Sequence, residues 1–372
     1  MKPKVRALEA IPLDGGFYLR DPMGISEGLW VSEHALYLIS LMDGTRSLLD
    51  IKADFLRATG YLLRDEEIKE LLESLEENFL LEGPRFRERL NALKQELISK
   101  GVREPSHVGI VYPSEPEELR SFLKLEEKEE TFPMLGIMAP HMDLRVAKRT
   151  YWEGYGRLRG EKKLVLILGV SHYWHEMPFS VLPVDIATPF GTLKTRKDLI
   201  NKLQELYTFD ITHDLLAYRQ EHSIEFASLY VGMLYPRAEV LAMIVSYGEL
   251  EFLKSLAENL LRLVEKELDQ TLVVSGIDLS HVGQKFGDVR SYDPSFRDIE
   301  YLELIKDLKV EEAFELLQKD KNRTRIDGQY TNVVFTHFLR QAGAKEGRLF
   351  DYDKHYERET DSVVSYASVG FM

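Results

Sequence analysis

The chain has 372 residues, 44% hydrophobic and 30% charged, so it is long enough for two domains and apolar enough to fold. It contains no cysteine, which excludes disulfides, thiolate nucleophiles and zinc–thiolate sites and leaves nitrogen and oxygen ligands for any metal. The net charge of −14 argues against nucleic acid as a partner, and the lack of a signal-like or roughly 20-residue apolar run favours a cytoplasmic protein with no membrane association.

Residues 1–100 are predicted to form a small helical, winged-helix-like module. A helix with an acidic first turn is expected after Arg64, and two others are expected over residues 32–42 and from Leu48 onwards. A short strand over residues 79–81 with a following turn would supply the wing. The expected core of this module contains the apolar residues Leu36, Leu48, Ile51, Leu71 and Leu75.

The charge of this module argues against DNA as its ligand. Residues 1–100 hold 14 Lys and Arg and 18 Asp and Glu, a net charge of −4, which does not support DNA binding. We therefore expect a module that binds a peptide or protein, and a purely structural appendage is the alternative. Residues 85–100 are expected to form a charged connecting helix.

Residues 101–372 are predicted to form an α/β domain whose sheet is flanked by helices, because apolar strands alternate with helical patterns. The expected strands are Gly136–Ala139, Leu164–Val170, Val240–Ser246, Thr271–Ile277 and Ser362–Phe371. The expected helices are Leu144–Leu158, Lys197–Glu205, Ser223–Leu234, Leu250–Glu267 and Val310–Gln318.

Three of these apolar runs lead into a histidine: His141, His172 and His281. Ligands in open α/β sheets gather at the carboxyl ends of strands, so the repeated placement predicts a shared pocket. His222 lies at the start of an expected helix, where it would either join the pocket or cap the helix. Imidazole is a good ligand for Fe, Cu and Zn. The other histidines are expected to be structural: His34, His107, His175, His213, His337 and His355.

Six motifs in order resemble the MEMO family over residues 102–372. They are Arg103–Pro113, Pro140-His141, Gly169–His172, Glu221–Glu225, Ser275–His281 and Asp361–Ala367. The resemblance implies a fold like that of class III extradiol dioxygenases, which bind non-haem iron and activate O₂. It also implies a radical SAM protein and an AMMECR1-like protein as partners, because bacterial and archaeal members are often called protein B of the AmmeMemoRadiSam system.

By this resemblance His141 and His172 are the first two metal ligands. The third family position can be Cys, and here it is Ser280, whose neutral hydroxyl is a poor ligand. Asp278 and His281 are the available substitutes. The expected cofactor is a divalent metal, with Fe(II) first and Cu or Zn as alternatives.

Three further residues are candidates for catalysis. His222, beside Glu221, would move a proton, and Asp143 would orient an imidazole unless it only caps the following helix. Arg323 and Arg325 would either clamp an anion or face solvent.

Three functions stay open at this point: a metal-dependent oxidoreductase, a protein that binds a peptide, protein or metal without catalysis, and a hydrolase that uses a serine. The hydrolase ranks last because no Gly-x-Ser-x-Gly pattern surrounds Ser171 or Ser280.

Overall fold

The structure, a computed structural model, describes residues 2–372. The chain divides between Ser99 and Lys100 into two compact units, which are described separately below. Within the described residues no helix has the length and apolar composition needed to cross a membrane.

The first unit begins with a three-stranded antiparallel sheet that the sequence pattern did not predict. Its strands are β1 (Glu9–Leu13), β2 (Gly16–Arg20) and β3 (Leu29–Val31), in the order β1-β2-β3. All five residues of β1 are exposed, so this strand lacks the alternation of buried and exposed residues that marks a strand in a sequence. The expected strand at residues 79–81 is reduced to one bridge between Val5 and Leu81.

Four helices follow in the first unit: α1 (Glu33–Ser40), α2 (Leu48–Thr59), α3 (Asp65–Glu77) and α4 (Pro84–Lys100). Helix α2 begins with a capping box between Ser47 and Asp50 and ends at Gly60, whose φ of 71° suits glycine. Ile51 and Leu75 are fully buried in the core of this unit. The other expected core residues, Leu36, Leu48 and Leu71, are partly buried and pack against that core.

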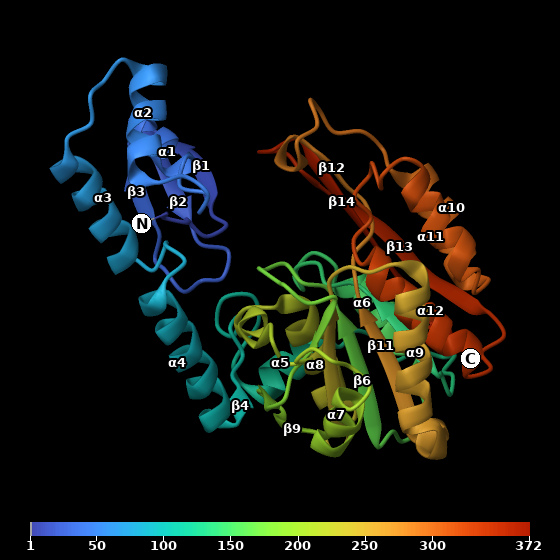
Figure 1. The fold of residues 1–372 in the computed structure, drawn as a ribbon. Helices are drawn as coiled ribbons and strands as arrows, with labels where there is room; N and C mark the ends of the chain where they lie inside the picture. Colours follow the sequence, from blue (N-terminus) through green and yellow to red (C-terminus); the bar gives the residue numbers. More distant parts are fainter. Residues whose placement is uncertain (1) are drawn as a thin grey trace. The chain divides into compact units, whose positions relative to one another are not determined.

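The second unit is built on an 11-stranded mixed sheet (Figure 1). Its main path runs in the order β12-β14-β5-β11-β6-β10-β9-β8-β4, with β13 paired to β14 and β7 paired to β10. The strands are β4 (Val102–Arg103), β5 (Gly136–Ala139), β6 (Leu164–Gly169), β7 (Phe179–Val181), β8 (Asp185–Thr188), β9 (Gly191–Thr195), β10 (Glu239–Val245), β11 (Thr271–Gly276), β12 (His281–Gly283), β13 (Gly347–Glu357) and β14 (Ser362–Phe371).

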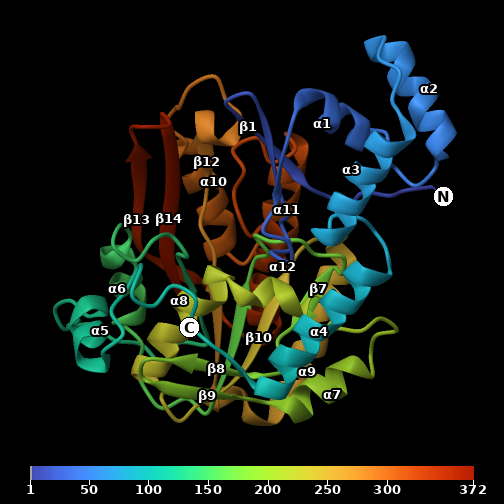
Figure 2. The same ribbon diagram turned by 90° about the vertical axis from the view of Figure 1, so that its left-hand side faces the viewer.

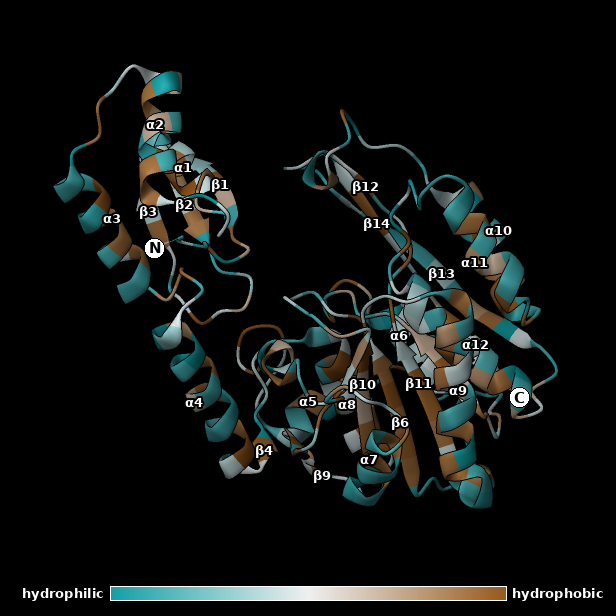
Figure 3. Ribbon diagram, in the orientation of Figure 1, coloured by the Kyte–Doolittle hydropathy of each residue, from teal (hydrophilic) through white to brown (hydrophobic). Residues whose placement is uncertain are grey.

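The centre of this sheet is parallel and its C-terminal edge is antiparallel. Strands β5, β11, β6 and β10 pair in parallel, so their carboxyl ends lie at one edge of the sheet. The long strands β13 and β14 form an antiparallel pair, visible side by side in Figure 2. Every residue of β5, β6 and β11 is buried, and Figure 3 shows the hydrophobic character of β6 and β10. This continuous burial explains why the sequence predicted these strands.

Helices cover both faces of the sheet. A Cβ on Gly136 would touch Leu339 of α12 (Gln329–Gln341), whereas the next residue, Ile137, reaches Gly154 of α6 (Lys148–Tyr155). Because successive strand residues point to opposite faces, α12 and α6 lie on opposite sides. Helix α8 (His222–Leu234) packs on β6 and β11, and α9 (Leu250–Val264) packs on α12. The remaining α-helices are α5 (Pro116–Leu123), α7 (Lys197–Gln204), α10 (Ser295–Lys306) and α11 (Val310–Lys319).

Three short 3₁₀ helices complete the unit, at η1 (Leu215–Arg219), η2 (Glu265–Gln270) and η3 (Gln284–Phe286). The mixed α/β sheet with flanking helices agrees with the predicted fold class. The helix expected at Leu144–Leu158 is shorter than predicted and begins only at Lys148, because residues 143–147 form a turn.

Candidate metal centre

His141 follows β5 and is nearly fully buried. Its Nδ1 lies 3.0 Å from the carbonyl oxygen of Gly276, on the neighbouring strand β11. Because a carbonyl can only accept, Nδ1 carries the hydrogen and the other ring nitrogen is left free to act as a ligand. That nitrogen, Nε2, lies 3.0 Å from Oδ2 of Asp327.

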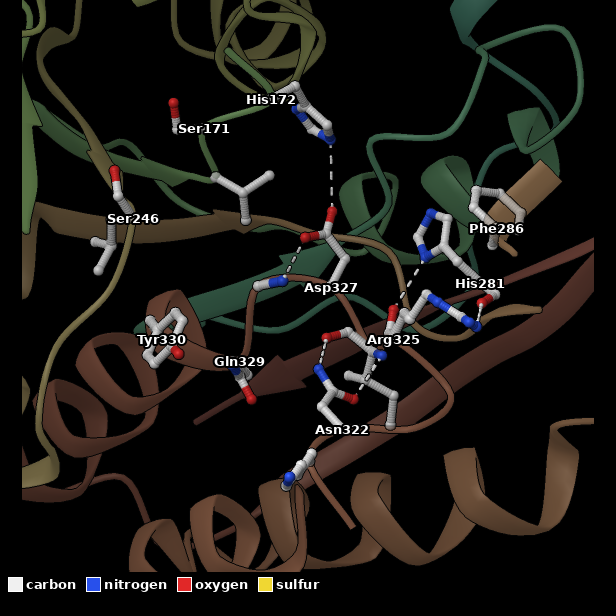
Figure 4. Close-up of a pocket in the computed structure, with 15 residues that line it drawn as sticks. Ser171, His172, Ser246, His281, Phe286, Asn322, Arg325, Asp327, Gln329 and Tyr330 are labelled. Atoms are coloured by element: carbon white, nitrogen blue, oxygen red, sulfur yellow. Dashed lines mark hydrogen bonds and ion pairs between the residues drawn. The ribbon is translucent and has the colours of Figure 1, made fainter. Parts of the chain in front are cut away.

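His172 follows β6, and its Nδ1 is also held by an acceptor, in this case a carboxylate. Its Nδ1 lies 2.9 Å from Oε1 of the fully buried Glu221, and its backbone N–H donates to Oε2 of the same side chain. Nε2 of His172 faces Asp327, with 3.6 Å between Nε2 and Oδ2 (Figure 4). The Nε2 atoms of both histidines therefore point at one carboxylate oxygen, and both Nδ1 atoms are held by other acceptors.

His222, the first residue of α8, completes a cluster of three histidines. Its ring centroid lies 4.2 Å from that of His172 and 5.0 Å from that of His141. One ligand atom from each of the three histidines lies within 4.8 Å of the other two, a spacing that one metal ion can bridge. The helix is capped by Glu221, which accepts from the N–H of Ser223, so His222 does not serve as the cap.

Asp327 is the functional residue that the sequence reasoning missed. It lies just before α12, its Oδ1 accepts from the N–H of Gly328, and Gly328 has a φ of 63°. An Asp-Gly pair before a helix is the ordinary signature of a turn, which concealed the role of the carboxylate. Its one signal in the sequence is its position two residues after Arg325, a residue of the possible anion clamp.

The neighbouring loop holds Asp327 in place. The side chain of Asn322 accepts from the N–H of Ile326 and donates to the carbonyl of the same residue, both at 2.8 Å. Arg325 binds Asp288 through two nitrogens, at 3.0 and 3.1 Å. These bonds fix the backbone on the N-terminal side of Asp327.

The charges of the site are strongly coupled. Burial opposes a charged imidazole at His172, but the hydrogen bonds that it donates to Asp327 and Glu221 raise its pKa to about 10. The pKa of His141 is also raised, since Asp278 and Asp327 outweigh the effect of burial. Burial and the two neighbouring histidines lower the pKa of His222 to about 3, so His222 is neutral. The site thus has an excess of carboxylate charge that attracts a cation.

Asp278 lies beside His141 but is mainly occupied by the backbone. Its Oδ1 accepts from the N–H groups of His141 and Met142, and its Oδ2 lies 3.6 Å from Nε2 of His141. This carboxylate supports the loop after β5 and adds negative charge to the site.

The structure does not bring Ser280, His281 or Asp143 into the cluster. Ser280 is fully buried and its hydroxyl donates to Asp298 at 2.5 Å. Nδ1 of His281 donates to the carbonyl of Leu279, and the ring lines the adjoining cavity instead. Asp143 forms an ion pair with Arg145, which satisfies its carboxylate away from the histidines. Sequence spacing cannot foresee these local partners.

A second buried network lies behind His222. Glu225, one turn along α8, forms an ion pair with Arg103 at 2.5 Å and accepts from the hydroxyls of Ser106 and Tyr112. These partners lower the pKa of Glu225 despite its burial. The network anchors the segment after β4 to the helix that carries His222, which accounts for the polar residues of the two sequence motifs.

A cavity of about 500 Å³ adjoins the centre. His172 and Asp327 form part of its wall, as do Ser171 and Ser246 (Figure 4). A cavity of this size accommodates a small organic molecule.

The donor set fits a divalent metal. Two neutral imidazoles and one carboxylate are the ligands of the 2-His-1-carboxylate sites of non-haem iron, and they also suit Zn and Mn. A cation in this position would replace the proton that the carboxylates now favour on the imidazoles.

Comparison with known proteins finds a matching family model and several similar relatives. Residues 103–370 match the family model described as "Memo-like protein". The whole chain is 47% identical to a MEMO1 family protein from Aquifex aeolicus, with 100% of both chains covered. A Thermus thermophilus protein named MEMO1 family protein TTHA0924 is 27% identical over 87% of this chain and 98% of its own length. An uncharacterized Escherichia coli K12 protein, JW3007, shares 12% identity with a TM-score of 0.35, covering 64% of this chain and 99% of that chain.

Proposed function

Because this chain belongs to the Memo-like protein family, we propose that His141, His172 and Asp327 hold a divalent metal in a dioxygenase-like oxidoreductase. The observation that carries this proposal is the convergence of two Nε2 atoms on one carboxylate, at 3.0 and 3.6 Å. Imidazoles oriented through Nδ1 by a carbonyl and a carboxylate are the usual arrangement around a metal in proteins.

A metal in this centre would supply Lewis-acid chemistry, and Fe(II) would also supply redox chemistry with O₂. The residues of the chain provide the rest. His222 is neutral and lies next to both ligand histidines, but a pKa lowered to about 3 makes it a weak proton acceptor, so a proton-transfer role for it requires that a bound group raise this pKa. Glu221 holds His172 in one tautomer, and it is a positioning residue.

The finer fold assignments belong to the same proposal. We propose an extradiol dioxygenase-like arrangement for residues 101–372 and a winged-helix-like one for residues 1–100. A radical SAM protein and an AMMECR1-like protein remain the proposed partners, on the ground of the family resemblance.

A second function is proposed for the first unit, which we expect to bind a peptide or protein. It contains an apolar cavity of about 370 Å³. The cavity wall is formed by α1, α2, α3 and the loop between α2 and α3, with the residues His34, Ala35, Leu38, Phe55, Tyr61, Leu63, Glu67 and Leu71. A cavity of this kind fits a hydrophobic side chain of a bound segment.

The test of the metal centre is the content of Fe, Mn, Zn and Cu in anaerobically purified protein, measured by elemental analysis. Wild type should hold close to one equivalent, and His141→Ala and His172→Ala should each lose it. His213→Ala is the matched control, because His213 is paired with Asp214 outside the cluster. A wild-type protein that takes up none of these metals would rule out the oxidoreductase and leave the binding function.

A further inference from the structure

The cavity next to the metal centre differs in charge from the rest of the protein. The chain has 62 acidic and 48 basic residues, yet Asp327 is the one acidic residue among the fifteen that line this cavity. That carboxylate faces the histidines. The permanently cationic side chains of the wall are Lys321 and Arg325. Apart from Asp327, no acidic side chain of the described residues lines the wall beside them.

Lys321 is the basic group that is free to bind a ligand. Arg325 is already neutralised by Asp288, with both nitrogens in contact. Lys321 is exposed and, among residues 2–372, no carboxylate lies within ion-pair distance of its amine. Lys321 lines the cavity, and no ion pair within the described residues neutralises its amine.

The backbone at this part of the wall is unusual. Lys321, Asn322 and Arg325 have φ values of 56°, 49° and 54°, and they account for three of the six non-glycine residues with positive φ in the described chain. Asparagine tolerates this conformation, whereas lysine adopts it rarely. At Lys321 the positive φ belongs to the end of α11, where the N–H of Asn322 donates to the carbonyl of Leu317 and the N–H of Lys321 donates to that of Gln318, as in a Schellman motif.

The wall also has an apolar part, to which Val170, Val245, Phe286 and Ile326 contribute. Phe286 lies on the same side of the cavity as His281 (Figure 4). The first turn of α12 borders the cavity as well, and its N-terminus has no side-chain cap, which adds weak positive potential.

We propose that this cavity binds a small anionic molecule with an apolar body, whose carboxylate or phosphate group is held by Lys321. The opposite end of the molecule would reach the metal centre. For this second contact alone, the inference rests on the proposed function. The ion pair with Lys321 does not depend on a metal.

The test uses the full-length protein and three probes of similar shape: benzoate, phenyl phosphate and the neutral benzamide. Binding is measured by calorimetry or ligand-observed NMR, with metal-free protein and with Mn(II)-loaded protein. One of the two anions should bind about tenfold more tightly than benzamide, and comparison of the two identifies carboxylate or phosphate as the group. Equal binding of all three probes, or no binding at roughly 10 mM, would overturn the proposal.

Two variants locate the contact. Lys321→Asn removes the charge and relieves the backbone, so the protein should stay folded while anion affinity falls about tenfold and benzamide affinity is unchanged. Arg323→Gln is the matched control, because Arg323 is an exposed cation of the same loop that does not line the cavity. If both variants weaken anion binding equally, the effect is general electrostatics and the inference is wrong.

Metal content of the same samples separates this inference from the proposed function. Anion binding that depends on Lys321 in protein unable to take up metal would leave the inference standing and reject the metal centre. Metal uptake without any preference for the anionic probes would leave the metal centre standing and reject the inference.

Discussion

Oδ2 of Asp327 lies 3.0 Å from Nε2 of His141, although one residue precedes α12 and the other follows β5. Helix α12 and strand β5 are distant in the sequence and meet only in the folded sheet, where α12 covers one face. A carboxylate placed this close to two imidazoles requires a proton or a cation between them to be stable. The relationship therefore makes Asp327 the residue on which the proposed centre depends.

Replacing Asp327 by Asn should abolish metal binding while the fold persists. The amide keeps the shape of the carboxylate but removes its charge, so the neutral histidines of the cluster would hold a divalent ion far less tightly. Asp143→Asn serves as the control, since Asp143 is paired with Arg145 and should not affect metal content. Elemental analysis of both variants checks the prediction, and an unchanged metal content in Asp327→Asn would contradict the proposed ligand set.

Replacing Ser280 by Ala should change stability and leave metal content unaltered. The Ser280 hydroxyl donates to the buried carboxylate of Asp298, which also accepts from Ser365 and Tyr352. Loss of one donor to a buried charged group should cost about 1–3 kcal/mol of unfolding free energy. Urea denaturation measures this cost, and metal analysis of the same sample tests whether the metal content is unchanged. Loss of metal without loss of stability would restore Ser280 as a ligand.

The sequence predicted those strands and helices whose pattern of buried residues can be recognised within the element itself. Strands β5 and β14 have the predicted bounds, and their residues are almost continuously buried. Helix α12 was missed because Thr331, Asn332 and Thr336 are buried polar residues that interrupt the apolar pattern. Asp327 was missed for a different reason, since its role arises only when α12 packs next to β5 and β6.

Replacing Arg103 by Met should destabilise the protein by about 3–5 kcal/mol, because Glu225 would remain as a buried carboxylate without its charged partner. The double variant Arg103→Met with Glu225→Gln should recover part of this loss, since no buried charge remains. A double-mutant cycle in urea gives the coupling energy. Additive effects of the two single changes would show that the ion pair is not coupled.

Metal affinity should rise with pH. In the metal-free protein Asp327 and Glu221 outweigh burial and raise the pKa of His172 to about 10, so this imidazole is protonated near neutral pH, and Asp278 and Asp327 raise the pKa of His141 as well. A metal needs them neutral, hence protons compete with it and affinity is lost as pH falls below that pKa. Calorimetry of Mn(II) binding in buffers of different ionisation enthalpy measures the protons released. Binding without proton release would contradict the charge assignment.

Removing the first unit should leave the metal centre intact. The ligands His141, His172 and Asp327 all belong to the second unit, and each is oriented by residues of that unit. The first unit has its own core around Ile51 and Leu75, and the second unit has a separate core cluster. A chain that begins at Lys100 retains Gly101, whose carbonyl accepts from Asp185, and should fold with the metal content of the full protein. Circular dichroism and elemental analysis test this. An insoluble or metal-free product would mean that the boundary at Ser99 does not separate independent units.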